Sequence, residues 1–299
     1  MNNTRSHEER DLGKRLKDAL SFLPADALAS ICNSYDMIGD IAIIRLTKQS
    51  ERFKEKIARA IMQLHGNVRT VLAQMSAIQG DFRLRKLEYV GGEDKTRTIH
   101  TESGCWFSVD VASCYFSPRL IHERMRIANQ VRDEVAVNMF AGVGCFSIIA
   151  AKHSIVKKIY SIDINPIAIQ FLRENVRINR VFGTVVPLLG DAKEIIGRNL
   201  NNVADRILMP LPGKAFEYLP FAFSALKKEG GLIHYYDFEY GKKAERSICK
   251  VSDRVMNWFD KIGVGAEVLC GHIVRSIGPH WFQIVLDVRV KSSSDKFNK

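Results

Sequence analysis

The stretch VNMFAGVGCFSIIAAK, residues 137–152, decides the fold expected for this chain. An apolar segment at residues 134–139 leads into a turn with Gly142 and Gly144, and a second apolar segment begins at Phe146. A strand, a glycine-containing turn and a helix in this order form an element that holds phosphate or nucleoside ligands. The stretch alone does not indicate which of these ligands it holds.

Strand and helix patterns alternate from residue 117 onward, which indicates parallel β-α-β units. We expect strands at residues 134–139, 158–163, 184–190, 206–209 and 231–237, and helices at residues 146–153, 166–179, 194–200, 215–226 and 242–262. Two longer strands follow at residues 266–277 and 281–290, and their short connection forces an antiparallel pair. This order resembles the α/β, Rossmann-like fold of S-adenosylmethionine-dependent methyltransferases, which ends in an antiparallel hairpin.

The first 113 residues have a different pattern, typical of a smaller α+β domain. The elements expected there are a helix within residues 1–20, a strand at 38–46, a helix at 51–66, strands at 68–75 and 83–90, and a hairpin of residues 96–101 and 105–111. We therefore expect two domains, an N-terminal α+β domain at residues 1–113 and a methyltransferase domain at residues 114–299.

The composition is that of a globular protein with a basic surface. The chain has 299 residues, of which 46% are hydrophobic, enough to bury a sizeable core. Lys and Arg number 44 against 33 Asp and Glu, which gives a net charge of +11 and favours a polyanionic partner such as nucleic acid. Many basic proteins bind no polyanion, so charge alone leaves this question open.

The cysteine pattern and the N-terminal sequence indicate the compartment. The six cysteines are scattered without a C-x-x-C pair, which favours neither a zinc site nor a disulfide framework. The opening residues are charged, unlike a signal peptide, and no apolar run approaches the roughly 18 residues that a membrane span requires. We expect a cytoplasmic protein without a metal site or membrane association.

Two carboxylates identify the ligand of the glycine turn. Ser147 stands after Gly142-x-Gly144-x-x, where a dinucleotide-binding fingerprint has a third glycine, so NAD is disfavoured. Asp163, at the end of the second strand, can accept hydrogen bonds from ribose hydroxyls, and Asp191, at the end of the third, can accept one from the adenine amine. Any nucleoside could use Asp163, whereas Asp191 and the lack of a Lys or Arg in the glycine turn favour S-adenosylmethionine. The alternative is that the two aspartates cap the helices that follow them.

The fourth strand ends in Pro210-Leu211-Pro212. Methyltransferases that act on planar amino groups often have a D/N-P-P-aromatic motif at this position, where backbone carbonyls orient the accepting nitrogen. Proline fixes φ and lacks an N–H, so the pair would form a rigid shelf. A plain strand terminator is the alternative reading.

The segment DVASCYFSPRLIHERMR, residues 110–126, precedes the glycine strand. If Pro118 opens a helix, Arg119, Glu123 and Arg126 share one face of it. A solvated Arg–Glu pair on a surface helix would have the same spacing.

Together, several segments resemble the archaeal and eukaryotic class of tRNA guanine-37 N1-methyltransferases. The resemblance extends from Ser34 to the last strand and is most specific in YFSPRL..ER. The same family includes wybutosine-synthesis enzymes, which transfer the 3-amino-3-carboxypropyl group of the same cofactor. The matching segments are SYDMIGDIAII, RLRKLEYVGGEDKTRTIH, VDVASCYFSPRLIHERMR, NMFAGVGCFSI, IDINPIAIQFLRENVRIN, MPLPGKAFEYL and GGLIHYYDF.

The resemblance implies roles for individual residues. Glu123 would be the general base that removes the proton from guanine N1, and Arg83 or Arg85 would stabilise the charge that develops on O6. Pro212 would belong to the catalytic shelf. The target guanine would leave its stack in the anticodon loop to reach the cofactor. The implied cofactor site consists of Tyr115, Arg124, Asn138, Phe140, Gly142, Asp163, Ile164, Asp191, Ala192 and Pro210.

Three features depart from the family pattern. Many members have Asp where this chain has Asn138, and many have Asn where it has Pro210. Longer members carry a further N-terminal domain that contacts the outer corner of tRNA, whereas the match here begins at Ser34. We expect a monomer that methylates guanine 37 with S-adenosylmethionine, its N-terminal domain positioning the RNA. Aminocarboxypropyl transfer to a wyosine-type base in tRNA and a non-catalytic RNA-binding protein are the alternatives.

Overall fold

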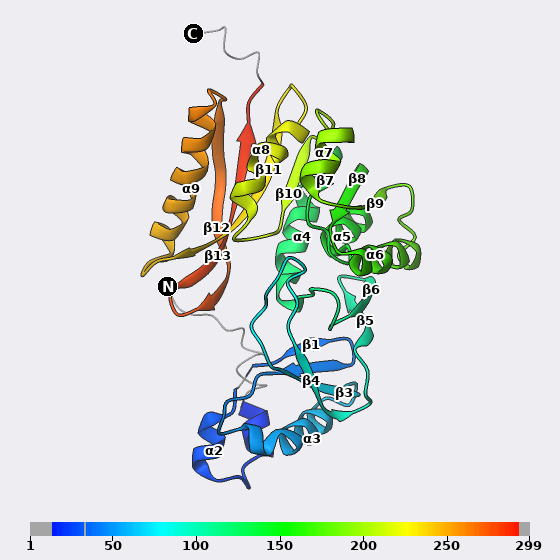
Figure 1. Cartoon of the computed structure of the whole chain (residues 1–299), viewed down its shortest axis with the longest axis vertical. Coiled ribbons are helices and arrows are strands. Elements are labelled where there is room, and N and C mark those ends of the chain that lie inside the picture. The colour runs from blue at the N-terminus through cyan, green and yellow to red at the C-terminus, as the bar shows by residue number, and fades with distance from the viewer. Residues whose placement is uncertain (1–13, 33, 293–299) are drawn as a thin grey trace. The chain divides into compact units, whose positions relative to one another are not determined.

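The computed structural model describes residues 14–32 and 34–292 of the chain. The chain divides into two compact units, Met1–Arg119 and Leu120–Lys299, and each has its own hydrophobic clusters (Figure 1). Across the described residues, no helix combines the length and the apolar character that a membrane crossing needs.

The first unit contains a four-stranded sheet in the order β1-β2-β3-β4, in which only β2 and β3 run parallel. A separate hairpin pairs β5 with β6. The elements are α2 (Ala25–Ser30), β1 (Asp36–Ile38), β2 (Ile41–Ile44), η1 (Glu51–Phe53), α3 (Lys54–Leu64), β3 (Thr70–Gln74), β4 (Leu87–Gly92), β5 (Arg97–Glu102), β6 (Cys105–Asp110) and η2 (Pro118–Leu120), whose last residue already belongs to the second unit.

In the first unit, one sequence-based prediction is wrong, and part of another falls on residues that the structure does not describe. The single strand expected at residues 38–46 is wrong, because the chain turns back at Gly39 and makes the antiparallel pair β1–β2. Gly39 has a φ of +57°, and a Cβ there would lie 2.2 Å from the Thr98 Oγ1. Of the helix expected within residues 1–20, residues 14–19 are helical, and residues 1–13 lie outside the described part.

The second unit confirms the α/β fold expected from the sequence. Its sheet has seven strands in the order β12-β13-β11-β10-β7-β8-β9. Strands β11, β10, β7, β8 and β9 are parallel, and β13 pairs antiparallel with both β11 and β12. The strands are β7 (Arg132–Asn138), β8 (Ile155–Asp163), β9 (Val185–Leu189), β10 (Arg206–Met209), β11 (Gly231–Tyr240), β12 (Ala266–Gly278) and β13 (Trp281–Val290).

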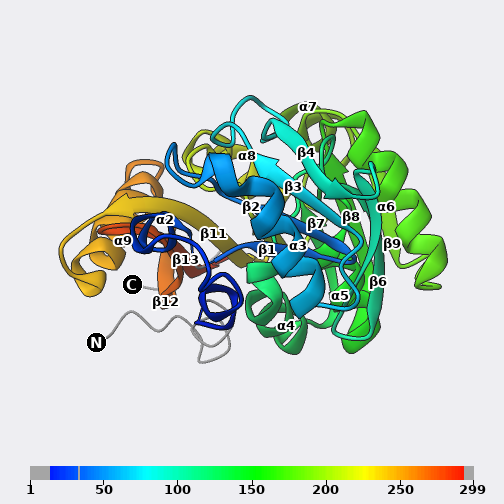
Figure 2. The ribbon, with the colours of Figure 1, turned by 90° about the horizontal axis from the view of Figure 1, so that it is seen from below.

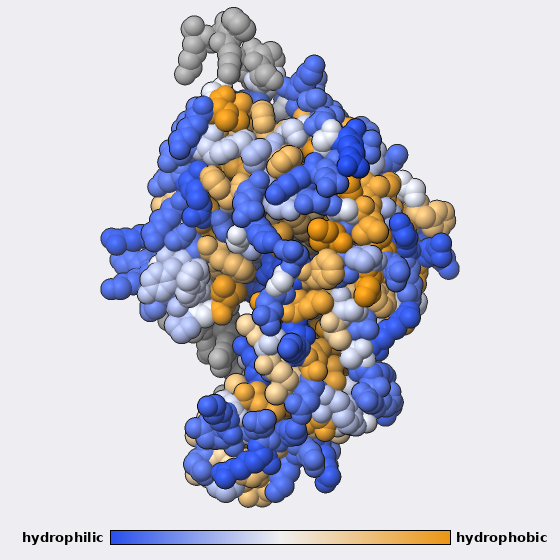
Figure 3. All heavy atoms as spheres, viewed as in Figure 1, coloured by the Kyte–Doolittle hydropathy of each residue, from blue (hydrophilic) through white to orange (hydrophobic). Residues whose placement is uncertain are grey.

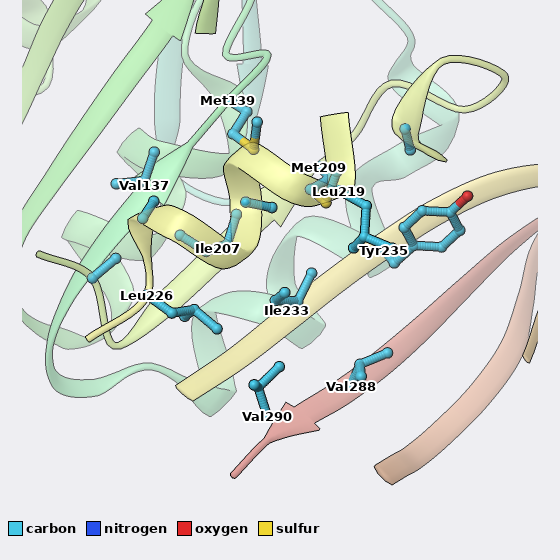
Figure 4. Packing of buried hydrophobic residues seen from close by; sticks show 14 of the residues in the cluster. Val137, Met139, Ile207, Met209, Leu219, Leu226, Ile233, Tyr235, Val288 and Val290 are labelled. Atoms are coloured by element: carbon cyan, nitrogen blue, oxygen red, sulfur yellow. The ribbon is translucent and has the colours of Figure 1, made fainter. Parts of the chain in front are cut away.

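Helices cover both faces of this sheet. Figure 2 shows α9 beside the β12 edge and α6 beside the β9 edge. Apolar residues of α7, α8 and α9 form one cluster with the strands, which includes Val137, Met139 and Val288 together with Leu219 of α8 and Leu226, the residue after α8 (Figure 4). The helices are α4 (Ile121–Gln130), α5 (Cys145–His153), α6 (Pro166–Ile178), α7 (Ala192–Asn199), α8 (Ala215–Ala225) and α9 (Ala244–Lys261).

The opposite face of the sheet packs against α4 and α5. Ile127 of α4 and Phe146 of α5 form a second buried cluster with Tyr236 of β11. Neighbouring residues of a strand point to opposite faces, so Tyr235 joins the first cluster and Tyr236 the second. This alternation places the Tyr236 hydroxyl beside α4.

Candidate cofactor and catalytic site

The glycine turn between β7 and α5 is built around backbone conformations that favour glycine. Gly142 has a φ of +55° and Gly144 a φ of +97°. A Cβ on Gly144 would lie 2.2 Å from the Leu172 Cδ1, so the residue also permits the close approach of α5 and α6. The turn therefore brings its backbone close to the carboxyl end of β7, where the Gly142 N–H donates to Asp163 and the Gly144 N–H to the Ala141 carbonyl.

Asn138 and Ser147 hold this turn from inside. The buried Asn138 amide donates to the Ser147 hydroxyl at 3.1 Å, and the Ser161 hydroxyl donates to the same oxygen at 2.7 Å. The Asn138 Oδ1 accepts the Phe140 N–H at 3.4 Å. Ser147 thus links α5 to the sheet at the position where a dinucleotide-binding fold has its third glycine.

Asp163 lies at the end of β8 and faces the turn. Its two oxygens accept the N–H groups of Gly142 at 2.6 Å and Asn165 at 2.9 Å. Burial raises the pKa of Asp163 above its ordinary value, although the two backbone hydrogen bonds oppose the shift. The cap of α6 is Asn165, which accepts the Ile167 N–H at 3.0 Å. Asp163 is therefore not a simple helix cap.

Asp191 both caps a helix and faces the carboxyl edge of the sheet. Its Oδ1 accepts the Lys193 N–H at 2.9 Å, which caps α7 as the alternative reading expected. Its Oδ2 accepts a 3.3 Å hydrogen bond from the hydroxyl of Tyr218. The Tyr218 ring packs edge-on against Phe140, with 4.9 Å between the ring centroids. Ala192, the next residue, is buried in the sheet cluster.

Exposed apolar side chains accompany these two carboxylates. Leu189 pairs in register with Asp163, and its side chain is 49% exposed. Ile164 follows Asp163 and is 44% exposed. Apolar surface beside carboxylates suits a ligand with a flat apolar ring and a polyhydroxylated sugar, as adenosine has. The described residues therefore fit the adenosine part of S-adenosylmethionine.

The proline shelf follows β10, and an aspartate of β11 orders the residue after it. The Leu211 N–H donates to the Met209 carbonyl at 2.8 Å, and Pro212 is buried. The Gly213 N–H donates to the Asp237 Oδ1 at 3.3 Å, and Arg254 of α9 donates to the other Asp237 oxygen at 2.7 Å. The residue that follows the shelf, Gly213, is thus held by a hydrogen bond to β11.

Glu123 is the most heavily hydrogen-bonded of the predicted catalytic groups. It lies in the first turn of α4 and is 5% exposed. Arg126 donates to both of its oxygens at 2.8 and 2.9 Å, the Tyr236 hydroxyl donates at 2.5 Å, and the His272 Nε2 lies 3.2 Å away. Burial raises the pKa of Glu123, but the bonds from His272, Arg126 and Tyr236 outweigh burial and hold the pKa below its ordinary value. Glu123 is therefore ionised at neutral pH.

A second buried carboxylate orients Arg126. Asp287 of β13 accepts two hydrogen bonds from Arg126, at 2.6 and 3.1 Å, and one from the His234 Nδ1 at 2.6 Å. The other ring nitrogen of His234 lies 2.6 Å from Arg206, which can only donate, so His234 is neutral with its proton on Nδ1. Burial accordingly lowers the pKa of His234 below its ordinary value. Four elements, α4, β10, β11 and β13, contribute to this network.

Two of the arginines of the first unit, Arg85 and Arg119, bind the same carboxylate. Asp36 accepts hydrogen bonds from Arg85 at 3.1 Å and from Arg119 at 2.9 Å. Burial raises the pKa of Asp36, but Arg119 and Arg85 outweigh burial and lower it. The expectation that Arg119 extends the face of Glu123 is wrong, since Arg119 lies in η2 and pairs with Asp36. The Arg83 guanidinium lies 4.9 Å from the ring centroid of Tyr115.

The structure thus brings one group of predicted residues to a common edge of the second unit. Asn138, Phe140, Gly142, Asp163, Ile164, Asp191, Ala192, Pro210 and Pro212 all lie at or just beyond the carboxyl ends of β7, β8, β9 and β10. Arg124 is 4% exposed, and its guanidinium lies 5.9 Å from the Phe146 ring centroid. Tyr115, Arg83 and Arg85 belong to the first unit.

The sequence placed Arg126 on the helix face of Glu123, and the structure pairs the two residues. Sequence reasoning missed Tyr236 and His272, the other partners of Glu123, and Asp287, which pairs with Arg126. These three residues come from later strands, and no local pattern marks them.

Comparisons with known proteins match both parts of the chain. A model described as the TRM5/TYW2 methyltransferase domain matches residues 98–264, and one described as the TYW2 N-terminal domain matches residues 16–96. The chain is 40% identical over 274 residues to the tRNA (guanine(37)-N(1))-methyltransferase Trm5b of Pyrococcus abyssi, and this match covers 90% of the chain and 78% of that protein.

Solved structures show the same similarity. The complex of aTrm5 and tRNALeu superposes with a TM-score of 0.77 at 34% identity and covers 97% of this chain and 80% of that one. The TYW2 of Pyrococcus horikoshii in complex with MeSAdo superposes with a TM-score of 0.76 at 30% identity and covers 94% of this chain and 100% of that one.

Proposed function

Because the chain belongs to the TRM5/TYW2 methyltransferase family, we propose that it transfers a methyl group from S-adenosylmethionine to N1 of guanine 37 in tRNA. The observation that supports this reaction most directly is the 40% identity with the Pyrococcus abyssi Trm5b. The net charge of +11 suits an RNA substrate. Such a substrate suggests a cytoplasmic enzyme, and we propose that it acts as a monomer on the anticodon arm.

The cofactor would lie at the carboxyl edge of the parallel strands. Asp163 would accept the ribose hydroxyls with the lone pairs not used by Gly142 and Asn165, and Asp191 would accept the adenine amine. Ile164 would cover one part of the ring. Tyr115, Arg124, Asn138, Phe140, Gly142, Ala192 and Pro210 complete the cofactor site that we propose. When bound, S-adenosylmethionine supplies an electrophilic methyl group.

Glu123 would remove the proton of guanine N1. N1 carries this proton at neutral pH, so alkylation requires a base at that atom. Glu123 is ionised and fixed by Arg126, and its Oε2 bonds His272, whose side chain is 33% exposed and is the most accessible partner. We propose that the guanine edge replaces or adjoins His272 at this oxygen. The Pro210–Pro212 shelf would orient the guanine edge through its carbonyl groups.

Arg83 or Arg85 would stabilise the negative charge on O6. A fixed guanidinium at that oxygen acts as a preorganised charge stabiliser. Arg85 is held by Asp36 and by the Gln74 side chain at 3.1 Å, which limits its rotamers. Arg83 has a φ of +54°, an uncommon conformation for a non-glycine residue.

A second candidate is transfer of the 3-amino-3-carboxypropyl group to a wyosine-type base in tRNA. The match of residues 16–96 to the TYW2 N-terminal domain favours it, as does the full coverage of the Pyrococcus horikoshii TYW2. The two reactions consume the same cofactor but leave different products.

Product analysis separates these candidates. The purified chain is incubated with S-adenosylmethionine and either an unmodified tRNA transcript with guanine 37 or tRNA carrying the tricyclic base. We expect 1-methylguanosine and S-adenosylhomocysteine with the transcript. Methylthioadenosine with a heavier nucleoside would establish the second candidate. Neither product, with cofactor binding absent in calorimetry and tRNA binding retained, would indicate a non-catalytic RNA-binding protein.

A further inference from the structure

An exposed aromatic group lies at the end of the C-terminal hairpin. It consists of Tyr240, the last residue of β11, His280 from the turn between β12 and β13, and Trp281, the first residue of β13; we refer to these three residues as the aromatic tip. The Tyr240 ring packs edge-on against Trp281, with 5.7 Å between centroids, and against His280, with 6.1 Å. Tyr240 and Trp281 are each 46% exposed. Large aromatic surface at a strand end contributes nothing to a core and suits a flat ligand.

The aromatic tip is rigidly held. Tyr240 and Trp281 are register partners in the antiparallel pair of β11 and β13, and the Gly241 N–H donates to the His280 carbonyl at 2.9 Å. The connection from Gly278 to Trp281 contains only Pro279 and His280. His280 has a φ of +61°, a conformation that costs free energy for a non-glycine residue. The backbone thus fixes the positions from which the rings project, and the rings pack against one another.

Cations surround the aromatic tip on its α9 side. Residues 241–250 contain four basic residues and one acid, Glu245. Lys242, Lys243 and Arg246 are exposed, and the exposed Lys250 donates to the Tyr240 carbonyl at 3.1 Å. The acid nearest in sequence to Tyr240, Glu239, is paired with Lys250 and Arg254 at 3.4 Å each. The local charge is therefore positive.

The aromatic tip shares an edge with the proposed cofactor site. Strand β11 is parallel to β10, β7 and β8, so Tyr240 and Asp163 both lie at carboxyl ends. In the sheet order, β11 is three strand spacings from β8, roughly 15 Å, and the register places Tyr240 four residues beyond the level of Asp163, roughly 13 Å along the strand. The two residues are therefore roughly 20 Å apart. Figure 1 shows the hairpin and the start of α9 at this end of the second unit. Nucleotides next to a base held at the cofactor can reach that far in an extended strand.

We propose that the aromatic tip is a stacking surface for an unpaired nucleotide of the RNA substrate, with Lys242, Lys243 and Arg246 binding the adjoining phosphates. This inference rests on the proposed function, because it takes the RNA from that reaction. Aromatic rings stack bases without regard to sequence, and neighbouring cations bind the backbone. The surface supplies affinity for a single-stranded loop, whereas the groups at the cofactor act on the target base.

The aromatic contribution is tested with Trp281→Ala, and Phe182→Ala is the matched control. Phe182 is 73% exposed in the connection between α6 and β9, outside the aromatic tip. Trp281→Ala is expected to weaken binding of a tRNA anticodon stem-loop about tenfold and to raise KM for tRNA similarly. The kcat at saturating tRNA and the Kd for S-adenosylmethionine stay unchanged. Phe182→Ala changes none of these quantities.

The phosphate contacts are tested with the double variant Lys242→Gln, Lys243→Gln. Its control is Lys261→Gln. Lys261 is the last residue of α9, so it lies far from Lys242 and Lys243, which precede the first turn of that helix. The double variant should lower the slope of log Kd against log salt by about one to two, and Lys261→Gln should leave it unchanged. Equal effects of the test and control variants would overturn the proposal.

The same measurements separate this inference from the proposed function. If the wild-type chain binds and modifies tRNA but Trp281→Ala does so equally well, the stacking surface is wrong and the function stands. If the wild-type chain modifies no tRNA but Trp281→Ala still weakens RNA binding, the function is wrong and the stacking surface stands. A Trp281-dependent dimer in sedimentation, with RNA binding unaffected by the variant, would assign the aromatic tip to a contact between copies and overturn its assignment to RNA.

Discussion

At the residue scale, two buried carboxylates of the second unit differ in the direction of their pKa shifts. Asp163 accepts only backbone N–H groups, and burial raises its pKa. Glu123 accepts bonds from a guanidinium, a hydroxyl and an imidazole, which lower its pKa in spite of burial. The difference follows from the side-chain hydrogen bonds of His272, Arg126 and Tyr236 to Glu123, which favour its ionised form, and the charge of Arg126 adds to them. Glu123 is accordingly held in the ionised form, the form in which a carboxylate can accept a proton.

Glu123→Gln tests the base directly. The amide cannot accept the N1 proton, so the rate of methyl transfer in a single turnover should fall about a hundredfold or more. Cofactor affinity in calorimetry should remain near the wild-type value, and circular dichroism should report a folded chain. Asp133→Asn, which removes an exposed carboxylate paired with Lys157, is the control and should retain full activity. A Glu123→Gln enzyme with an unchanged rate would remove Glu123 from the proposed role.

His272 should influence the acid limb of the pH profile through its effect on the pKa of Glu123. It lies on the edge strand β12, and its Nε2 is 3.2 Å from Glu123, whose pKa it lowers. His272→Ala removes this donor, so the pKa of Glu123 should rise and the acid limb of kcat/KM should move to higher pH. His272→Gln can restore a donor and should move the limb less. Identical acid limbs in the three proteins would show that His272 does not act through Glu123.

At the element scale, Gly144 joins strand, turn and helix. Its φ of +97° and the contact that a Cβ would make with Leu172 both oppose any side chain. Gly144→Ala should lower the free energy of unfolding by about 2–4 kcal/mol, measured by urea denaturation. Gly197→Ala in α7 is the matched control, because a Cβ there meets no atom within 4 Å. That control should leave stability unchanged or raise it by about 0.5–1 kcal/mol; equal losses would contradict the prediction.

Element type was predictable where the signal is local. The alternation of apolar strands and helices from residue 134 onward predicted each element of the sheet, with ends that differ by a few residues. The turn at Gly39 was missed, because apolar residues on both sides of Gly39-Asp40 look like one strand and the tight packing of Gly39 against Thr98 is a tertiary contact. The carboxylates at strand ends were predictable, since parallel strands bring their carboxyl ends to one edge. The strand partners of Glu123, Tyr236 and His272, were not predictable, because they are distant in sequence, and neither was Asp287, which orients Arg126.

At the scale of the whole molecule, the buried ionic network links α4 to three strands of the sheet. Asp287 accepts hydrogen bonds from Arg126, His234 and Gln130, so it joins β13 to α4 and β11. Burial raises the pKa of Asp287, but the bonds from His234 and Arg126 outweigh burial and hold it well below its ordinary value. Removing one partner from such a network leaves a buried charge uncompensated. The network should therefore make stability depend on pH.

The sign of this dependence follows from the direction of each shift. The pKa of His234 is lowered in the folded chain. As the pH falls below the ordinary value of 6.5, the unfolded chain therefore binds a proton at His234 that the folded chain does not bind, which favours unfolding. Glu123 and Asp287 also have lowered pKa values, so their stabilisation is complete above ordinary values of 4.5 and 3.8 and disappears as pH falls through the folded values. We expect the free energy of unfolding to decrease as pH falls below about 6.5, and to decrease further below about 4.5.

Urea denaturation at a series of pH values checks this expectation, with Asp287→Asn as the comparison. The variant should be less stable by about 3–5 kcal/mol at neutral pH, because Arg126 loses its second carboxylate. It should also lose less stability on acidification below pH 4.5, since one of the carboxylates that must be protonated is absent. Asp133→Asn should follow the wild-type curve, because its ion pair is exposed. Wild-type stability that is flat or increases between pH 7 and pH 5 would contradict a neutral, buried His234 at the centre of the network.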